Sequence, residues 1–174
     1  MSEGGNEVVN EKATAMLEET REKTHRKIER LAIVNRGEAA VRCIRTAKSL
    51  RALEGEGLDV VALYTTPDRD APFVRQADRA FELPSTNGAV AAYLDHDSLL
   101  AALREVGADA VWPGWGFVAE DPAFVERLQE AGIVFLGPTA AAMRQLGDKI
   151  TSKRLAETAN VPVTDWSGGE LEDE

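Results

Sequence analysis

Short apolar stretches alternate with amphipathic ones along most of this chain, and that order limits the folds available to it. Strands are expected at LAIV (31–34), LDVVALYTT (58–66), about 80–83, ADAVW (108–112) and GIVFLG (132–137). Helices are expected at 35–53, early in 71–84, and at 95–107, 121–131, 139–147 and 148–160. Parallel strands need long crossover connections, which helices supply. The order therefore predicts an α/β fold, a parallel sheet with helices on its faces.

The two ends of the chain differ from this pattern. Residues 7–30 mix Glu with Lys and Arg and contain no Gly or Pro, which predicts a solvent-facing helix that extends the fold. We expect a charged helical extension at 1–26, one domain over 27–168, and an acidic linker at 169–174. The Gly-Gly and acidic residues of that last segment are typical of a linker or of a point where a longer chain is cut.

The formal net charge of -10 limits the possible partners. Such a charge repels nucleic acid and also opposes ATP, so an anion site must be local or supplied by another domain. No apolar run is long enough for a membrane span, and the polar start has no signal-peptide centre. We therefore expect a cytoplasmic protein with no nucleic-acid and no membrane partner. The single cysteine, Cys43, is expected as buried filler, and no metal site is expected.

The segment WPGWGFVAED (112–121), here called the aromatic turn, follows an expected strand. Parallel sheets bind ligands at the carboxyl ends of their strands. Gly114 and Gly116 have no Cβ, so a planar ligand can approach the backbone, with Trp115 as a flat wall. The alternative is that both tryptophans only plug the end of the sheet. Glu120 and Asp121 are expected as capping groups rather than acid–base catalysts, because no histidine lies near them in sequence.

Two further stretches carry charged residues at expected helix starts. NRGE (35–38) has one glycine where a dinucleotide site has three, which argues against NAD. Glu38 is expected to be structural, and Arg36 either binds a ligand or partner carboxylate or is solvated. Lys149 lies in the first turn of a helix, where its charge opposes the helix dipole. It contacts a phosphate or is a solvated lysine.

Together these motifs resemble a known family. KIERLAIVNRGEAAVRCIR (27–45), ADRAFELP (77–84), YLD (93–95), the aromatic turn and FLGPTAAAMRQLGDKI (135–150) are similar, in order and spacing, to the N-terminal domain of biotin carboxylases. The likeness covers about residues 27–168. Trp112, Trp115 and VPVTDWSGG (161–169) look more like the large multidomain acetyl-CoA carboxylases than the small bacterial subunit.

The resemblance implies a Rossmann-like, pre-ATP-grasp domain of an enzyme that carboxylates biotin. In that family ATP activates bicarbonate as carboxyphosphate, and the carboxyl group passes to the ureido nitrogen of biotin. By residue match, Lys149 would contact the nucleotide, and Trp115 with Gly116 would border the biotin and bicarbonate end of the cleft. Arg42 and Arg45 match a helix of the dimer interface in bacterial relatives, whereas the large enzymes dimerise differently.

The chain ends at Glu174, before the family's glycine-rich ATP lid, metal-binding glutamates and bicarbonate-binding basic residues. The resemblance therefore implies an inactive fragment with no catalytic residue of its own. Its partners would be the ATP-grasp remainder, a biotin carboxyl carrier and a carboxyltransferase, and its cofactors ATP, biotin and Mg or Mn. Either the chain is a piece of a longer one or it is a separate subunit. The alternatives are a non-catalytic interaction or regulatory module that reuses the fold, and a stand-alone nucleotide-binding domain.

Overall fold

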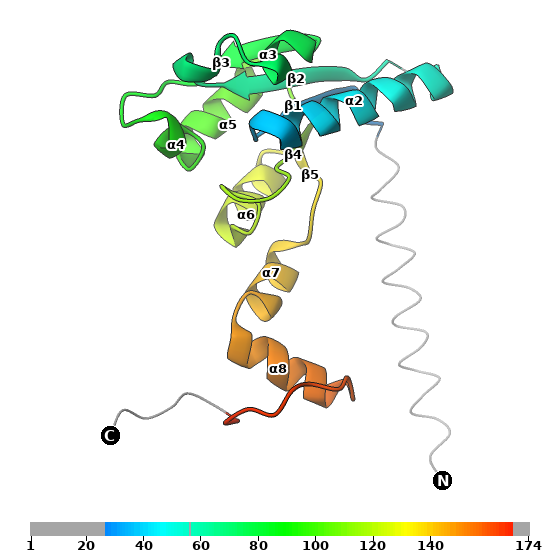
Figure 1. Ribbon diagram of the computed structural model, residues 1–174, viewed down its shortest axis with the longest axis vertical. Helices are drawn as coiled ribbons and strands as arrows, with labels where there is room; N and C mark the ends of the chain where they lie inside the picture. Colours follow the sequence, from blue (N-terminus) through cyan, green and yellow to red (C-terminus); the bar gives the residue numbers. More distant parts are fainter. Residues whose placement is uncertain (1–26, 56, 169–174) are drawn as a thin grey trace.

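The computed structural model describes residues 27–55 and 57–168 (Figure 1). Its strands are β1 (Arg30–Ile33), β2 (Asp59–Tyr64), β3 (Arg79–Glu82), β4 (Ala110–Trp112) and β5 (Val134–Phe135). Its helices are α2 (Gly37–Glu54), α3 (Pro72–Gln76), α4 (Ala89–Ala92), α5 (His96–Glu105), α6 (Pro122–Glu130), α7 (Ala140–Leu146) and α8 (Lys149–Thr158), with a 3-10 turn η1 (Thr66–Asp68).

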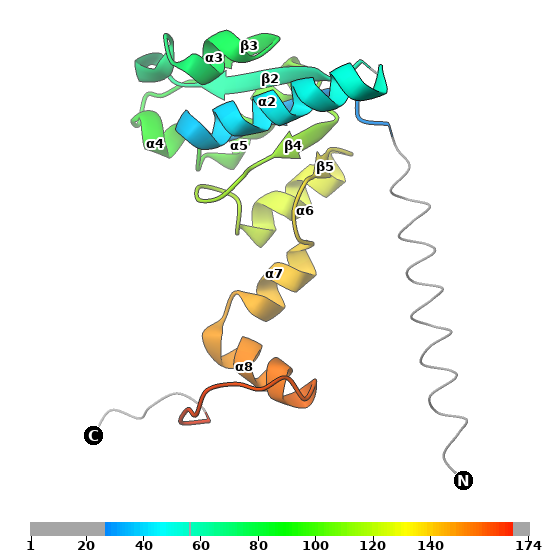
Figure 2. The same ribbon diagram turned by 45° about the vertical axis from the view of Figure 1, so that its right-hand side comes forward.

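The strands form one five-stranded sheet in the order β3-β2-β1-β4-β5, and every pair is parallel. Helices α2 and α3 cover one face, where Ile33, Ile44 and Phe73 are fully buried together. Helices α5 and α6 cover the other face, and the core there includes Leu99 and Phe124 (Figure 2). The expected α/β fold with a parallel sheet and helices on both faces is confirmed.

The start of the described chain departs from the prediction. Residues 27–29 form no helix and Arg30 begins β1, so the predicted helix is wrong over residues 27–30. Arg30 fits a strand because its backbone N–H donates to the carboxylate of Asp109, at 3.2 Å, and its guanidinium donates to the carbonyl of Val106 at 2.9 Å. These tertiary contacts override the helical charge pattern. The rest of the predicted extension lies outside the described residues.

Smaller differences concern the ends of elements. Strand β2 ends at Tyr64 and η1 begins at Thr66, so the strand expected over 58–66 is two residues too long. Strand β5 has only two residues, fewer than the strand expected over 132–137, and it lies at the sheet edge. Helix α4 was not expected, and its four residues are too few to give a periodic pattern.

Helix starts were predicted well where a side chain caps them. Asp95 accepts hydrogen bonds from two backbone N–H groups at the start of α5, and Asp121 does so at the start of α6. Thr139 caps α7, and Asp148 caps α8.

Helices α7 and α8 form an arm that extends away from the sheet (Figures 1 and 2). Helix α8 has no buried residue, and Leu146, Leu155 and Val161 are exposed along the arm. No helix within the described residues is long and apolar enough to cross a membrane.

Candidate functional site at the carboxyl edge of the sheet

The sheet has a switch point between β1 and β4. From β1 the chain proceeds to β2 and β3 on one side and then returns to β4 and β5 on the other. In open parallel sheets, ligands bind outside the carboxyl ends of the two strands at such a point. Here those ends lead into Asn35 and into the aromatic turn, which makes this edge the candidate site.

Asn35 holds the aromatic turn against the end of β1. Its side-chain Nδ2 donates to the carbonyl of Pro113 at 2.6 Å and to that of Trp115 at 2.9 Å. Its Oδ1 accepts from the backbone N–H of Arg36 at 2.7 Å. Asn35 is only 4% exposed, so these bonds satisfy a polar group that burial would otherwise destabilise. No role was predicted for Asn35, although it opens the NRGE motif and a polar residue directly after a buried strand is an available signal.

The backbone of the aromatic turn is unusual. Gly114 and Gly116 have φ values of 64° and 74°, and Phe117, which is not glycine, has φ 46°. Left-handed backbone at Phe117 is unfavourable for an L residue and must be held by its surroundings. The ring of Phe117 packs against that of Tyr93, with 4.9 Å between the ring centroids. Tyr93 is fully buried, and its hydroxyl donates to the carbonyl of Leu63.

The far end of the aromatic turn is held by a pair that sequence distance concealed. His96 Nε2 lies 2.8 Å from Asp121 Oδ2, although 25 residues separate them. Burial tends to raise the pKa of Asp121, but hydrogen bonds from Phe124 N–H and His96 outweigh it and leave that pKa below its usual range. A histidine therefore does lie beside Asp121. Because Asp121 caps helix α6, the contact serves the fold rather than acid–base catalysis. Glu120 is exposed, with no hydrogen bond or ion pair in the described part of the chain.

The two tryptophans of the turn have different environments. Trp112 is half-buried and packs against the core cluster beneath α2, whereas Trp115 is 60% exposed. The expectation that both plug the end of the sheet therefore describes Trp112 and not Trp115. We call Trp115 and Gly116, both exposed, the lip.

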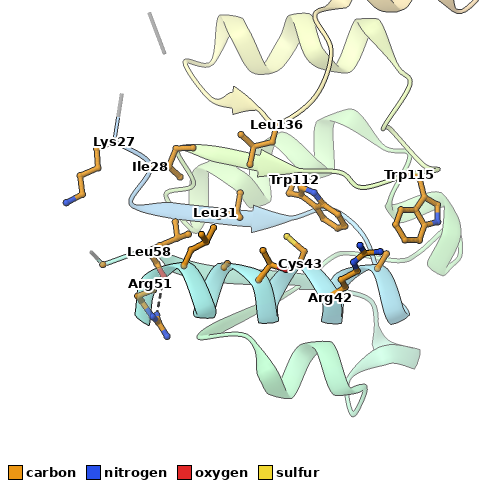
Figure 3. Close-up of a pocket in the computed structure, with 15 residues that line it drawn as sticks. Lys27, Ile28, Leu31, Arg42, Cys43, Arg51, Leu58, Trp112, Trp115 and Leu136 are labelled. Atoms are coloured by element: carbon orange, nitrogen blue, oxygen red, sulfur yellow. Dashed lines mark hydrogen bonds between the residues drawn. The ribbon is translucent and has the colours of Figure 1, made fainter. Parts of the chain in front are cut away.

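A groove of about 670 Å³ runs between α2 and the β1–β4 side of the sheet, and Trp112 and Trp115 stand at one end of it (Figure 3). Its lining is mostly apolar, with Leu31, Cys43, Leu58 and Leu136 among the residues, and the side chain of Arg42 also lines it. Burial raises the pKa of the Cys43 thiol to about 11, so this cysteine is a poor nucleophile, but it is half-buried at the groove rather than the buried filler that was expected.

The other residues singled out in the sequence lie apart from the lip. Arg45 is exposed on α2, and its Nε donates to the side chain of Gln76 at 3.2 Å. Lys149 is exposed and begins α8, so the arm separates it from the lip (Figure 1). Glu38 is exposed in the first turn of α2. No group of three potential metal-binding side chains occurs in residues 27–55 and 57–168.

Arg36 pairs with a carboxylate of its own chain, a partner that neither sequence hypothesis named, while its side chain stays 47% exposed. Its guanidinium donates twice to the carboxylate of Asp68, through Nε at 2.7 Å and through an Nη at 2.6 Å. Asp68 is buried, and the pair joins the loops that follow β1 and β2. The sequence does not indicate this partner. Asp68 lies 32 residues from Arg36, and the turn η1, which was not predicted, brings its carboxylate to the guanidinium.

Comparison with known proteins shows which family the chain belongs to. The family model for the N-terminal domain of biotin carboxylase matches residues 27–143. The biotin-dependent acyl-coenzyme A carboxylase alpha3 subunit of Mycobacterium leprae is 41% identical over 137 residues, which are 79% of this chain and 22% of that protein. The biotin carboxylase of Haemophilus influenzae is 37% identical over 142 residues, 82% of this chain and 30% of that protein.

Solved structures agree with the sequence matches. The biotin carboxylase domain of the Hydrogenobacter thermophilus 2-oxoglutarate carboxylase, solved with MgADP, ADP and bicarbonate, superposes with a TM-score of 0.77 at 35% identity. That match covers 86% of this chain and 31% of the other. The chain therefore spans less than a third of each of these relatives.

Proposed function

The chain belongs to the biotin carboxylase family and carries its N-terminal domain, and from this premise we propose that it forms one wall of the cleft in which biotin is carboxylated. The observation that carries the proposal is the exposed lip, which Asn35 holds at the switch point of the sheet. In the proposed reaction ATP phosphorylates bicarbonate, and the resulting carboxyphosphate transfers its carboxyl group to the ureido nitrogen of biotin, with release of phosphate.

The lip is suited to the biotin end of this cleft. The exposed indole of Trp115 offers a flat apolar face to a ring of similar size, and Gly116 leaves the backbone beside it open. Apart from its two chain neighbours, no described residue has an atom within 4 Å of a Cβ built on Gly116, so the described part of the chain leaves the space in front of it open.

Lys149 is the proposed nucleotide contact. It is exposed at the first position of α8, beside Asp148, which caps that helix. One exposed cation cannot balance the charge of a triphosphate, so we expect the remaining cations and the Mg or Mn site in the ATP-grasp remainder of the enzyme. The exposed apolar residues of the arm, Leu146, Leu155 and Val161, are consistent with such a partner covering it.

Other features of the proposal depend on parts of the enzyme outside this chain. A biotin carboxyl carrier and a carboxyltransferase would complete the carboxylase. Arg42 and Arg45, both exposed on α2, are the proposed contacts to a second copy. Three expectations stay predictions: the closer likeness to large acetyl-CoA carboxylases, the cytoplasmic location, and the domain boundaries after residues 26 and 168.

The test compares the complete polypeptide that contains this chain with the 174-residue chain alone. With ATP and bicarbonate, the complete polypeptide should release ADP at a rate that rises with added biotin, and Lys149→Met should raise the KM for ATP. The chain alone should neither hydrolyse ATP nor bind it at micromolar concentration in calorimetry. Bicarbonate-dependent ATP hydrolysis by the chain alone would contradict the proposal, and a complete polypeptide without biotin-dependent turnover would favour a non-catalytic module.

A further inference from the structure

The backbone of the lip is held from beneath by one side chain. Within residues 27–55 and 57–168, Asn35 is the side chain that hydrogen-bonds to the backbone between Pro113 and Gly116. It uses both N–H groups of its amide on two carbonyls of the turn, and its own oxygen is anchored on Arg36 N–H. Rotation of the amide would break all three bonds, so the group is fixed in one orientation.

The bond to Trp115 also determines the direction of the next peptide N–H. No cis peptide bond occurs in the described part of the chain, and in a trans peptide the C=O and N–H groups point in opposite directions. Because the carbonyl of Trp115 points inward to Asn35, the N–H of Gly116 points away from it. Gly116 is exposed, and its N–H has no acceptor among the described residues.

We propose that Asn35 is a positioning residue that aims the N–H of Gly116 at an acceptor oxygen of the ligand bound against Trp115. The inference rests on the proposed function, which supplies ligands with such an oxygen, the ureido carbonyl of biotin or bicarbonate. A donor held in place before the ligand arrives requires no reorganisation when it binds. The carboxamide is required for this role, because a carboxylate at position 35 has no proton to donate to two carbonyls.

The test uses the complete polypeptide with Asn35→Asp and Asn35→Ala. Asp keeps the shape of Asn but removes both donors, and Ala leaves the two carbonyls to water. We expect each variant to raise the KM for free biotin or for bicarbonate by about tenfold, the ratio that corresponds to one hydrogen bond. The KM for ATP should stay within about twofold of the wild type, because Lys149 lies on the arm. The ligand whose KM rises is the one that accepts from Gly116.

Tyr93→Phe is the matched control. It also removes one buried hydrogen bond, from the hydroxyl to the carbonyl of Leu63, but it keeps the ring that packs on Phe117. Its KM values should equal those of the wild type. If Asn35 only stabilises the fold, its variants and Tyr93→Phe will lower the unfolding temperature and leave every KM unchanged, which overturns the inference.

Two other outcomes are separable. Loss of folding in both Asn35 variants assigns the residue to stability alone and overturns the inference. A wild type with no biotin-dependent turnover refutes the proposed function instead, and the inference with it. An active wild type with unchanged KM values in folded variants refutes the inference only.

Discussion

Arg36 and Asp68 form a two-point ion pair across the carboxyl edge of the sheet, with donor–acceptor distances of 2.7 and 2.6 Å. The side chain of Asp68 is only 11% exposed, whereas that of Arg36 is 47% exposed. The buried partner is therefore the carboxylate, and the arginine is the group that keeps its charge satisfied. This pair fixes the loop after β1 relative to the loop after β2, next to Asn35.

Removing the arginine should destabilise the fold more than removing an ordinary surface cation. Arg36→Ala leaves the Asp68 carboxylate buried without its donors and should lower the free energy of unfolding by about 2 kcal/mol, a value moderated by solvent at the exposed guanidinium. Arg69→Ala is the control, because Arg69 pairs with Glu82 at the surface, where solvent screens the pair, and its loss should cost clearly less. Urea denaturation checks both, and equal losses would contradict the buried-partner account.

The two tryptophans should separate stability from function. Trp112→Ala removes a half-buried ring from the α2 side of the core and should destabilise the chain by about 2 kcal/mol. Trp115→Ala removes a ring that is 60% exposed and should change stability by less than about 0.5 kcal/mol. In the complete polypeptide, Trp115→Ala should still lower biotin-dependent turnover. Equal destabilisation by the two variants would instead support a plug at both positions.

Asp121 should contribute a pH-dependent part of the stability. Its folded-state pKa lies below the usual value, so its contribution is present above the unfolded pKa of about 4 and is lost as the pH falls through the folded pKa. Asp121→Ala should therefore lower the free energy of unfolding by about 1 kcal/mol at pH 7, the usual cost of a lost N-cap. The difference from wild type should shrink below about pH 4 in urea titrations.

Asp95→Ala is the matched control for Asp121. Asp95 caps α5 in the same way, with hydrogen bonds from two backbone N–H groups, but it lies outside the aromatic turn. It should give a similar loss of stability, whereas Asp121→Ala alone should change the fluorescence of Trp115. A fluorescence change in both variants would show that the cap and the turn are not specifically linked.

The architecture was predictable because it depends on signals that are local in sequence. Apolar runs and the expected cap residue Asp121 placed most of the helices and strands, and their alternation gave the parallel sheet. Helix α4 was missed and strand β5 was predicted too long. Their four and two residues are too few to show a helical or strand periodicity.

The site was predictable only where its residues are adjacent in sequence. The two residues of the lip, Trp115 and Gly116, lie within one motif and are exposed, and their role at a ligand stays a prediction. The residues that hold it come from other elements: Asn35 is 78 residues from Pro113, and His96 is 25 residues from Asp121. Only the register of β1 against β4 and the packing of α5 against α6 bring these groups together. No spacing rule in the sequence encodes contacts of this kind.

Gly114 and Gly116 provide the sharpest test of the turn, because both have left-handed backbone but their surroundings differ. A Cβ on Gly114 would lie 2.7 Å from the ring of Trp112 and 2.9 Å from Nδ2 of Asn35, whereas a Cβ on Gly116 would meet no described residue within 4 Å beyond its chain neighbours. Gly116→Ala should therefore cost about 1 kcal/mol from backbone strain alone. Gly114→Ala adds overlap with two packed side chains and should cost about 3 kcal/mol in urea denaturation. Equal costs would mean that strain alone, rather than close approach to Asn35, explains the glycine at position 114.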